Sequence, residues 1–210
     1  MLTLHRAALV LPDPADPTAP SFADGAVLVR DERVEAVGPY PELAAAHPAA
    51  RVRDWGPAVL TPGLRNPYGQ RALERDYHPD PREGIGSEPL TDELVGCADE
   101  TRFGASARRG LQRMLGFGVT AVAGPFERAS VRTAVARSGL VVLPGPAEPG
   151  AGLLDPLAVL PLARAVHGRL AAGGRADFAV FAVGDEGESG PLPGGVLATV
   201  LGGRLVYRRR

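Results

Sequence analysis

The chain has 210 residues, of which 45% are hydrophobic and 22% are charged, and its formal net charge is −1. This balance is ordinary for a soluble globular protein, and it lacks the basic surplus that most nucleic-acid-binding proteins carry. No apolar run is long enough to span a bilayer. We therefore expect neither a nucleic-acid partner nor a membrane partner.

Cysteine and lysine usage narrows the chemistry further. Cys97 is the only cysteine, so no intramolecular disulfide ties the chain to an oxidising compartment. The first residues are typical of a strand and a turn, without the apolar core and cleavage site of a signal peptide, and we expect a cytoplasmic protein. All 23 basic residues are arginines, so no lysine is available as a Schiff-base former or as a carbamylated metal bridge.

The first third of the chain is predicted to be mainly β structure. Asp31 and Glu32 form a two-residue connection between two apolar runs, as in a β-hairpin. Pro41 opens a short helix predicted at 41–47, where its missing N–H is tolerated. The predicted strands lie at 2–11, 25–30, 33–38, 51–55 and 58–61.

The middle of the chain changes character at Glu100. Residues 65–99 are rich in charged residues, Pro and Gly, and they predict an irregular loop with a short helix near 70–74. From Glu100, apolar residues recur at helical spacing until Gly116. A strand at 119–123, a helix at 127–138 and a strand at 140–143 follow, which is the local order of a parallel α/β unit.

The last part of the chain is predicted to return to β structure. Residues 154–170 predict a third helix, and two apolar β runs follow at 177–183 and 196–207. The second run is expected to bend at Gly202 and Gly203.

Three segments together resemble a known family. Residues 25–38 read GAVLVRDERVEAVG and are followed at 58–64 by AVLTPGL, residues 110–122 read GLQRMLGFGVTAV, and residues 170–181 read LAAGGRADFAVF with GGRLVY at 202–207. In this order they resemble amidohydrolases such as imidazolonepropionase and aminodeoxyfutalosine deaminase. The resemblance covers both ends of the chain well and the middle only partly.

The resemblance implies a mixed α/β fold with a composite β-sandwich built from both ends of the chain. We expect this domain at 1–61 and 174–210, and a truncated remnant of a (β/α)₈ barrel at 62–173. The remnant has roughly 110 residues, whereas an eight-unit barrel takes about 250 and seldom fewer than 200. Two strands are expected there, at 119–123 and 140–143, with a third candidate at 58–64.

Metal-dependent hydrolysis by such a barrel needs a cation held by several His or carboxylate ligands. The resemblance implies that the first two are a His-x-His pair just after the Thr-Pro-Gly strand. In this sequence those positions are Tyr68 and Gln70, and neither is an ordinary ligand for zinc or iron. The sequence therefore predicts no catalytic residue, no metal ligand and no cofactor.

Two candidates could replace the missing site, a cluster of ligand-type residues and the single cysteine. Asp76, His78 and Asp80 form the one local cluster of ligand-type residues, with Glu74 and Glu83 nearby, and they are an alternative site for zinc or iron. A solvated, proline-stiffened loop is the competing interpretation of the same segment. The other three histidines, His5, His47 and His167, are expected on framing elements, and Cys97 has no sequence signature of a nucleophile.

Two functions follow from these observations. The first is a non-catalytic, amidohydrolase-like protein that binds a partner. Because a partial barrel leaves strand edges that must be covered, we expect a homo-oligomer or a protein partner, with a small-molecule ligand as a further candidate. The alternative is a hydrolase of carbon–nitrogen non-peptide bonds, acting on a cyclic amide or an amino-purine through a site rebuilt from His78, Asp76 or Asp80, with Glu100 as a further candidate residue.

Overall fold

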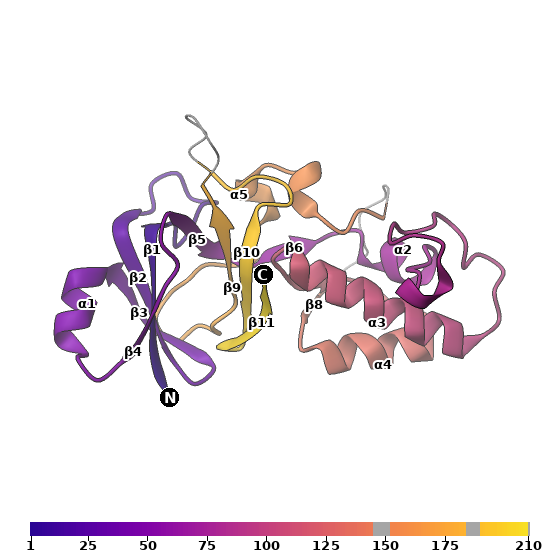
Figure 1. The fold of residues 1–210 in the computed structure, drawn as a ribbon, viewed down its shortest axis with the longest axis horizontal. Coiled ribbons are helices and arrows are strands. Elements are labelled where there is room, and N and C mark those ends of the chain that lie inside the picture. The colour runs from indigo at the N-terminus through magenta and orange to yellow at the C-terminus, as the bar shows by residue number, and fades with distance from the viewer. Residues whose placement is uncertain (145–151, 184–189, 210) are drawn as a thin grey trace.

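The computed structural model describes residues 1–144, 152–183 and 190–209, and it contains one large and one small β-sheet (Figure 1). The large sheet has the strand order β11-β10-β9-β5-β1-β2-β3, and β4 pairs with β1 beside β5. Its strands are β1 (Leu2–Val10), β2 (Phe22–Arg30), β3 (Arg33–Pro39), β4 (Arg51–Asp54), β5 (Ala58–Pro62), β9 (Phe178–Ala182), β10 (Val196–Leu201) and β11 (Arg204–Arg208).

The two ends of the chain meet in the large sheet. Strand β5 pairs antiparallel with β9, so that Val59 lies opposite Phe181. Side chains of β2, including Val27 and Val29, share one buried cluster with Phe178 of β9 and with residues of β10. The sheet thus curls around a common core, and the predicted mixed α/β fold with a composite β domain is confirmed.

Two short turns shape the edges of this sheet. The predicted hairpin at Asp31 and Glu32 joins β2 to β3, with Asp31 at a φ of 54°. At the other edge the predicted bend at Gly202 and Gly203 is a complete reversal, because β10 and β11 pair antiparallel. Both glycines have positive φ, which a two-residue hairpin turn requires and which costs glycine little.

The small sheet contains three parallel strands in chain order, β6 (Leu64–Asn66), β7 (Val119–Ala123) and β8 (Val141–Leu143). The helices α2 (Gly69–Glu74) and α3 (Glu100–Gly116) lie between β6 and β7 in the chain, and α4 (Ala129–Ser138) lies between β7 and β8. Both strands predicted at 119–123 and 140–143 are found, as is the short helix near 70–74.

The segment predicted as a third candidate strand, 58–64, divides between the two sheets. Gly63 is the point of passage: its N–H donates to the carbonyl of Asp177, and Leu64 begins β6. A methyl group on Gly63 would lie 2.1 Å from Oγ1 of Thr120, so only glycine lets β5 continue into β6 at this distance from β7.

The prediction of one continuous helix at 154–170 is wrong. The structure has only a 3₁₀ turn, η2 (Pro156–Ala158), and a four-residue helix, α5 (Leu162–Ala165). Pro156 and Pro161 lack the N–H that a continuous helix would need, and each begins or precedes one of the short turns. His167 therefore lies beyond α5 and not on a helix.

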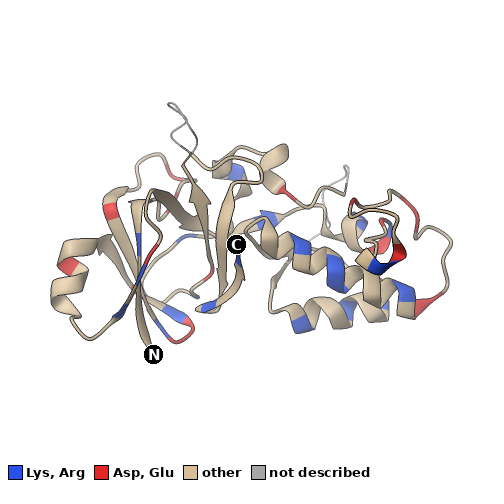
Figure 2. Cartoon of the chain, viewed as in Figure 1, with Lys and Arg blue, Asp and Glu red and all other residues tan. Residues whose placement is uncertain are grey.

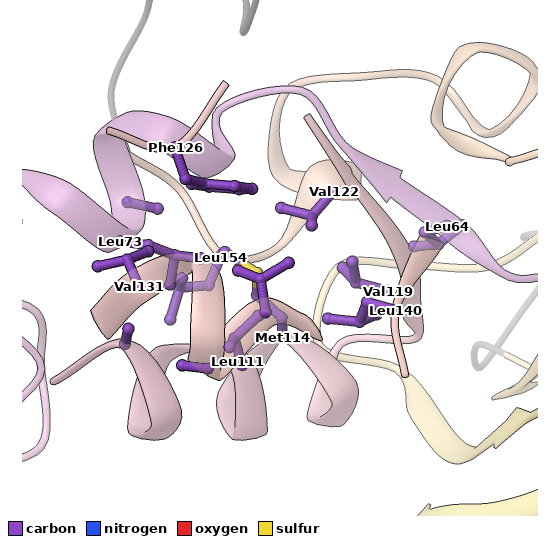
Figure 3. Close-up of a cluster of buried hydrophobic side chains, with 14 of the residues drawn as sticks. Leu64, Leu73, Leu111, Met114, Val119, Val122, Phe126, Val131, Leu140 and Leu154 are labelled. Atoms are coloured by element: carbon purple, nitrogen blue, oxygen red, sulfur yellow. The ribbon is translucent and has the colours of Figure 1, made fainter. Parts of the chain in front are cut away.

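The helix α3 is the longest in the described residues and carries the core of the α/β part. Asp99 caps its N-terminus by accepting the N–H of Thr101 at 2.8 Å. Leu111 and Met114 of α3 converge with Val119 and Val122 of β7, with Val131 of α4 also in the cluster (Figure 3). Phe181 and Val196 of the large sheet belong to the same cluster, so the two sheets share buried apolar contacts.

The remaining helical elements are short. Helix α1 (Tyr40–Ala46) packs against the large sheet at the end remote from α3, and η1 (Pro81–Glu83) is a single 3₁₀ turn (Figure 1). Within the described ranges, no helix has the length and apolar character that a bilayer crossing requires.

Candidate functional site at the carboxyl edge of the small sheet

The carboxyl ends of β6, β7 and β8 define the place where a parallel α/β sheet usually carries its functional side chains. Strand β6 leads into Asn66 and the first turn of α2, and β7 leads into Gly124 and Phe126. Strand β8 leads to Pro144, the last described residue before 152.

Asn66 is the one buried polar side chain at the end of β6. Its Oδ1 accepts the N–H of Tyr68 at 2.8 Å, and its Nδ2 donates to the carbonyl oxygens of Leu153 at 2.8 Å and Leu154 at 3.3 Å. The amide thus uses both of its ends in holding one stretch of chain against another.

The same stretch follows β6 along its edge. Nε of Arg65 donates to the carbonyl of Arg164 at 2.9 Å, and the N–H of His167 donates to the carbonyl of Gly63 at 2.8 Å. Leu64 forms an isolated antiparallel bridge with Val166. Residues 153–167 therefore cover the β6 edge of the small sheet.

Tyr68 and Gln70, at the positions where the resemblance places the metal ligands, lie at this carboxyl edge. Tyr68 is the residue before α2 and Gln70 lies in its first turn, and both are partly buried. Between them, Gly69 packs so closely on β7 that a methyl group there would lie 2.3 Å from Val122 and 2.5 Å from the carbonyl of Ala123. A phenol and a carboxamide supply neither an imidazole nor a carboxylate for a cation.

His78 is fully buried and belongs to the packing between α2 and α3. Its Nε2 lies 2.7 Å from the carbonyl of Ala72, and its own backbone N–H donates to Oγ of Ser106 at 2.9 Å. The carbonyl is an acceptor, so Nε2 carries the proton in this contact. Burial lowers the pKa of His78 and favours the neutral ring.

Asp76 and Asp80 are engaged in separate local contacts. Asp76 is buried, and its Oδ1 accepts the N–H of Asp92 at 3.0 Å. Asp80 accepts the N–H of Arg82 at 3.0 Å at the start of η1, and its Oδ2 lies 3.8 Å from Nη1 of Arg109. Among the residues that the structure describes, no three His, Cys, Asp or Glu side chains gather as a metal site would require.

The neighbouring carboxylates hold backbone and hydroxyl groups in place. Glu74 accepts the N–H of Arg128 at 2.7 Å, and burial raises the pKa of Glu74. Glu83 accepts the hydroxyl of Tyr77 at 2.5 Å, and Glu100 accepts the N–H of Ser130 at 3.1 Å.

The other predicted candidates lie apart from this edge. His5 is buried in the large sheet between Trp55 and Phe178, and His47 follows α1. Cys97 is partly buried, and its carbonyl accepts a hydrogen bond from Arg128.

One pocket with acid–base groups was not predicted from the sequence. It has a volume of about 280 Å³ and is lined by Asp76, Glu88, Arg113 and Asp155, among others. Burial raises the pKa of Asp155, whose carboxylate accepts the N–H groups of Gly194 at 2.8 Å and Leu157 at 3.0 Å. The sequence signal at this pocket is the Asp-Pro pair that opens η2, and such a pair predicts a helix cap but not a pocket.

Comparison with known proteins relates the chain to deaminases and part of it to a family of composite domains. Residues 25–50 match the family described as imidazolonepropionase-like composite domain, bacteria. The chain is 30% identical over 191 residues to a 5-methylthioadenosine/S-adenosylhomocysteine deaminase of Nitratidesulfovibrio vulgaris (strain DP4), an alignment that takes in 85% of this chain and 41% of that protein. The chain thus spans about two fifths of the length of the curated relatives it matches.

Structural alignment matches about two thirds of the chain to parts of two solved deaminases. Guanine deaminase from Bradyrhizobium japonicum is 18% identical with a TM-score of 0.48, over 67% of this chain and 34% of that one. Helicobacter pylori aminofutalosine deaminase is 17% identical with a TM-score of 0.43, over 68% of this chain and 32% of that one. On the sequence relationship, the chain is a homologue of deaminases of the amidohydrolase superfamily.

Proposed function

We propose that the chain is a cytoplasmic, non-catalytic amidohydrolase-like protein that acts by binding a partner. The observation that carries the proposal is the carboxyl edge of the small sheet, where Asn66 joins Leu153 and where Tyr68 and Gln70 occupy the expected ligand positions. The hydrolysis that the family implies requires ligands for a metal ion, and an amide and a phenol are not ordinary ligands for zinc or iron.

The residues present do not fit the zinc or iron that the family implies. His78 directs Nε2 at the carbonyl of Ala72, and Gly110 packs against the same side of its ring. Asp76 and Asp80 accept different backbone N–H groups. A cation at this cluster would have to displace these contacts.

The partner we propose is a second copy of the chain, bound through β8. Strand β8 pairs with β7 on one side, and its other side has no backbone partner within 1–144, 152–183 and 190–209. Val142 in its centre is 51% exposed. An exposed strand edge with an apolar side chain is suited to pairing with another chain.

The first test measures metal and turnover together. Untagged protein is incubated with zinc or iron, dialysed and analysed for bound metal. Release of ammonia is then followed with 5-methylthioadenosine and S-adenosylhomocysteine, the compounds in the relative's name. We expect neither retained metal nor ammonia. One equivalent of retained metal that is lost in His78→Ala would overturn the non-catalytic proposal.

The second test measures assembly. Sedimentation velocity of the full chain is expected to show a dimer, and Val142→Lys is expected to shift it to a monomer because it places a charge on the paired edge. Val159→Lys is the matched control, since Val159 is 50% exposed but lies after η2 and away from β8. A monomeric wild-type chain, or equal effects of both variants, would contradict pairing through β8.

The second candidate function is hydrolysis of a carbon–nitrogen non-peptide bond, and the 30% identity to a deaminase favours it. The pocket of Asp76 and Asp155 is the place where acid–base groups face a common space. If ammonia is released, two variants locate the site. Asp155→Asn should reduce the rate if the reaction takes place in this pocket. His78→Gln should reduce the rate if the reaction takes place at the cluster of Asp76, His78 and Asp80.

A further inference from the structure

A second, larger groove lies where the α/β part meets the end of the large sheet. It has a volume of about 690 Å³, within the size range of small-molecule sites. The groove runs between the last turns of α3, the loop before and after η1, and the end of β11. Its lining includes Arg109, Gln112, Arg113, Phe117, Tyr207 and Arg209.

Three guanidinium groups line this groove. Arg109 and Arg113 are four residues apart on α3 and so share one face of the helix, and Arg209 follows β11. Figure 2 shows the arginines of α3 as successive blue bands along the helix, and Glu100 at its far end is its one acidic residue. Among the described residues that line the groove there is no Asp or Glu.

The guanidinium groups are held by neutral acceptors. Nε of Arg109 donates to the carbonyl of His78 at 2.7 Å, Nη1 of Arg113 donates to the carbonyl of Ser87, and Nη2 of Arg209 donates to the carbonyl of Gly194. Carbonyl oxygens orient these groups without cancelling their charge.

Two carboxylates outside the lining approach the arginines. Asp80 lies 3.8 Å from Arg109, and Glu88, whose side chain is 85% exposed, lies 3.6 Å from Arg113. Each carboxylate offsets part of the charge of its arginine, whereas Arg209 has no carboxylate partner among the described residues. Positive side chains near the C-terminal end of a helix stabilise it, which is one reason for Arg113 on α3. Helix stabilisation gives no reason for Arg209, which lies after β11.

The groove also offers flat apolar surfaces. Tyr207 lies against Gly116, where a methyl group would be 3.4 Å from the ring, and Phe117 follows directly. Arginines together with aromatic rings recognise ligands that join a phosphate to a planar group, because guanidinium binds phosphate oxygens in pairs and rings stack on rings.

We infer that this groove binds a small aryl or heteroaryl phosphate, with the phosphate between Arg113 and Arg209 and the planar group against Tyr207 and Phe117. The inference does not depend on pairing through β8, because none of the residues it uses belongs to that strand. Arg113 and Phe117 also line the pocket of Asp76 and Asp155, whereas Tyr207 and Arg209 line this groove and not that pocket.

Isothermal titration calorimetry with phenyl phosphate, inorganic phosphate and phenol tests the inference. We expect phenyl phosphate to bind most tightly, inorganic phosphate more weakly, and phenol not at all. Arg113→Gln and Arg209→Gln should each weaken phenyl phosphate by about tenfold, as expected for loss of a charge-assisted hydrogen bond. Tyr207→Leu should weaken phenyl phosphate but leave inorganic phosphate unchanged.

The matched control is Arg208→Gln. Arg208 neighbours Arg209 in the chain, but it does not line the groove and it lies near Arg53 on the large sheet. Its loss should change the affinity by less than about twofold, since a distant exposed charge is screened. Absence of binding by phenyl phosphate, or equal losses in Arg208→Gln and Arg209→Gln, would overturn the inference.

Discussion

The side-chain amide of Asn66 donates a hydrogen bond of 2.8 Å to the carbonyl oxygen of Leu153. The two residues are 87 positions apart in the chain, and the bond fixes residues 153–154 to the end of β6. In a parallel α/β sheet this end is where a ligand would enter. Here a buried amide and two backbone carbonyls are paired with each other, so the end of β6 serves the fold.

This pairing predicts a strong effect of a small change. Asn66→Asp keeps the shape of the side chain but sets a buried carboxylate against the carbonyls of Leu153 and Leu154. The free energy of unfolding should fall by about 2–4 kcal/mol. Gln70→Glu makes the same amide-to-acid change on a partly buried side chain in the first turn of α2, and should alter stability by less than about 0.5 kcal/mol. Urea unfolding of both variants checks this, and a stable Asn66→Asp would contradict it.

The close contact between His78 and Gly110 predicts that the same substitution has different effects at two glycines of α3. Alanine usually stabilises a helix relative to glycine, by about 0.5–1 kcal/mol. At Gly110, however, the added methyl group would lie 2.6 Å from Nε2 of His78, so Gly110→Ala should destabilise the protein by about 1–3 kcal/mol. At Gly116, in the same helix, the nearest atom is 3.4 Å away, and Gly116→Ala should be neutral or stabilising. Thermal unfolding of the two variants measures this difference, and equal shifts in Tm would contradict the close packing of Gly110 on His78.

The local pattern of the sequence was sufficient for most elements of the fold. Alternating apolar residues identified the strands of the large sheet, and the helical spacing of Ala107, Leu111 and Met114 identified α3. These patterns reflect burial on one face of a strand or a helix, which depends on residues nearby in the chain.

Two features required knowledge of contacts distant in the chain. The sequence at 154–170 has helical spacing of leucines, but Pro156 and Pro161 divide it, and Asn66 and Gly63 provide hydrogen bonds that hold it along β6. Likewise, Asp76, His78 and Asp80 are adjacent in sequence yet face different partners, because the chain turns between them. Spacing alone does not reveal where a loop points its side chains.

Asp177 links the composite sheet to the hairpin at its edge, and this gives a third prediction. Its Oδ1 accepts the N–H of Gly202 at 2.6 Å, and burial raises the pKa of this carboxyl. Asp177→Ala leaves that buried N–H without an acceptor and should cost about 1–3 kcal/mol. Asp177→Asn retains an oxygen at the same place and should recover most of the loss. Hydrogen exchange at the amide of Gly202 measures this directly, and equal exchange in the two variants would count against the role of the side chain.

His5 predicts a specific dependence of stability on pH. Burial, with a smaller effect from Arg53, lowers the pKa of His5 to about 3, while an unfolded chain has a His pKa of about 6.5. Below about pH 6.5 the unfolded chain therefore binds a proton that the folded chain does not, so stability is fully present above that pH and is lost as the pH falls toward 3. For this residue the loss between about pH 7.5 and about pH 5 is roughly 2 kcal/mol.

The comparison that isolates this effect is His5→Phe, which keeps a ring beside Trp55 and Phe178 but removes the titrating group. Burial also lowers the pKa of His78 and His167 and raises that of Asp155 and Asp177. Those groups titrate in both proteins, so the difference between the two stability curves reports His5 alone. Urea unfolding at several pH values should show the variant losing less stability on acidification than the wild type. Parallel curves would mean that His5 is not held neutral in the folded chain, and that its contact with Phe178 does not exclude water from the ring.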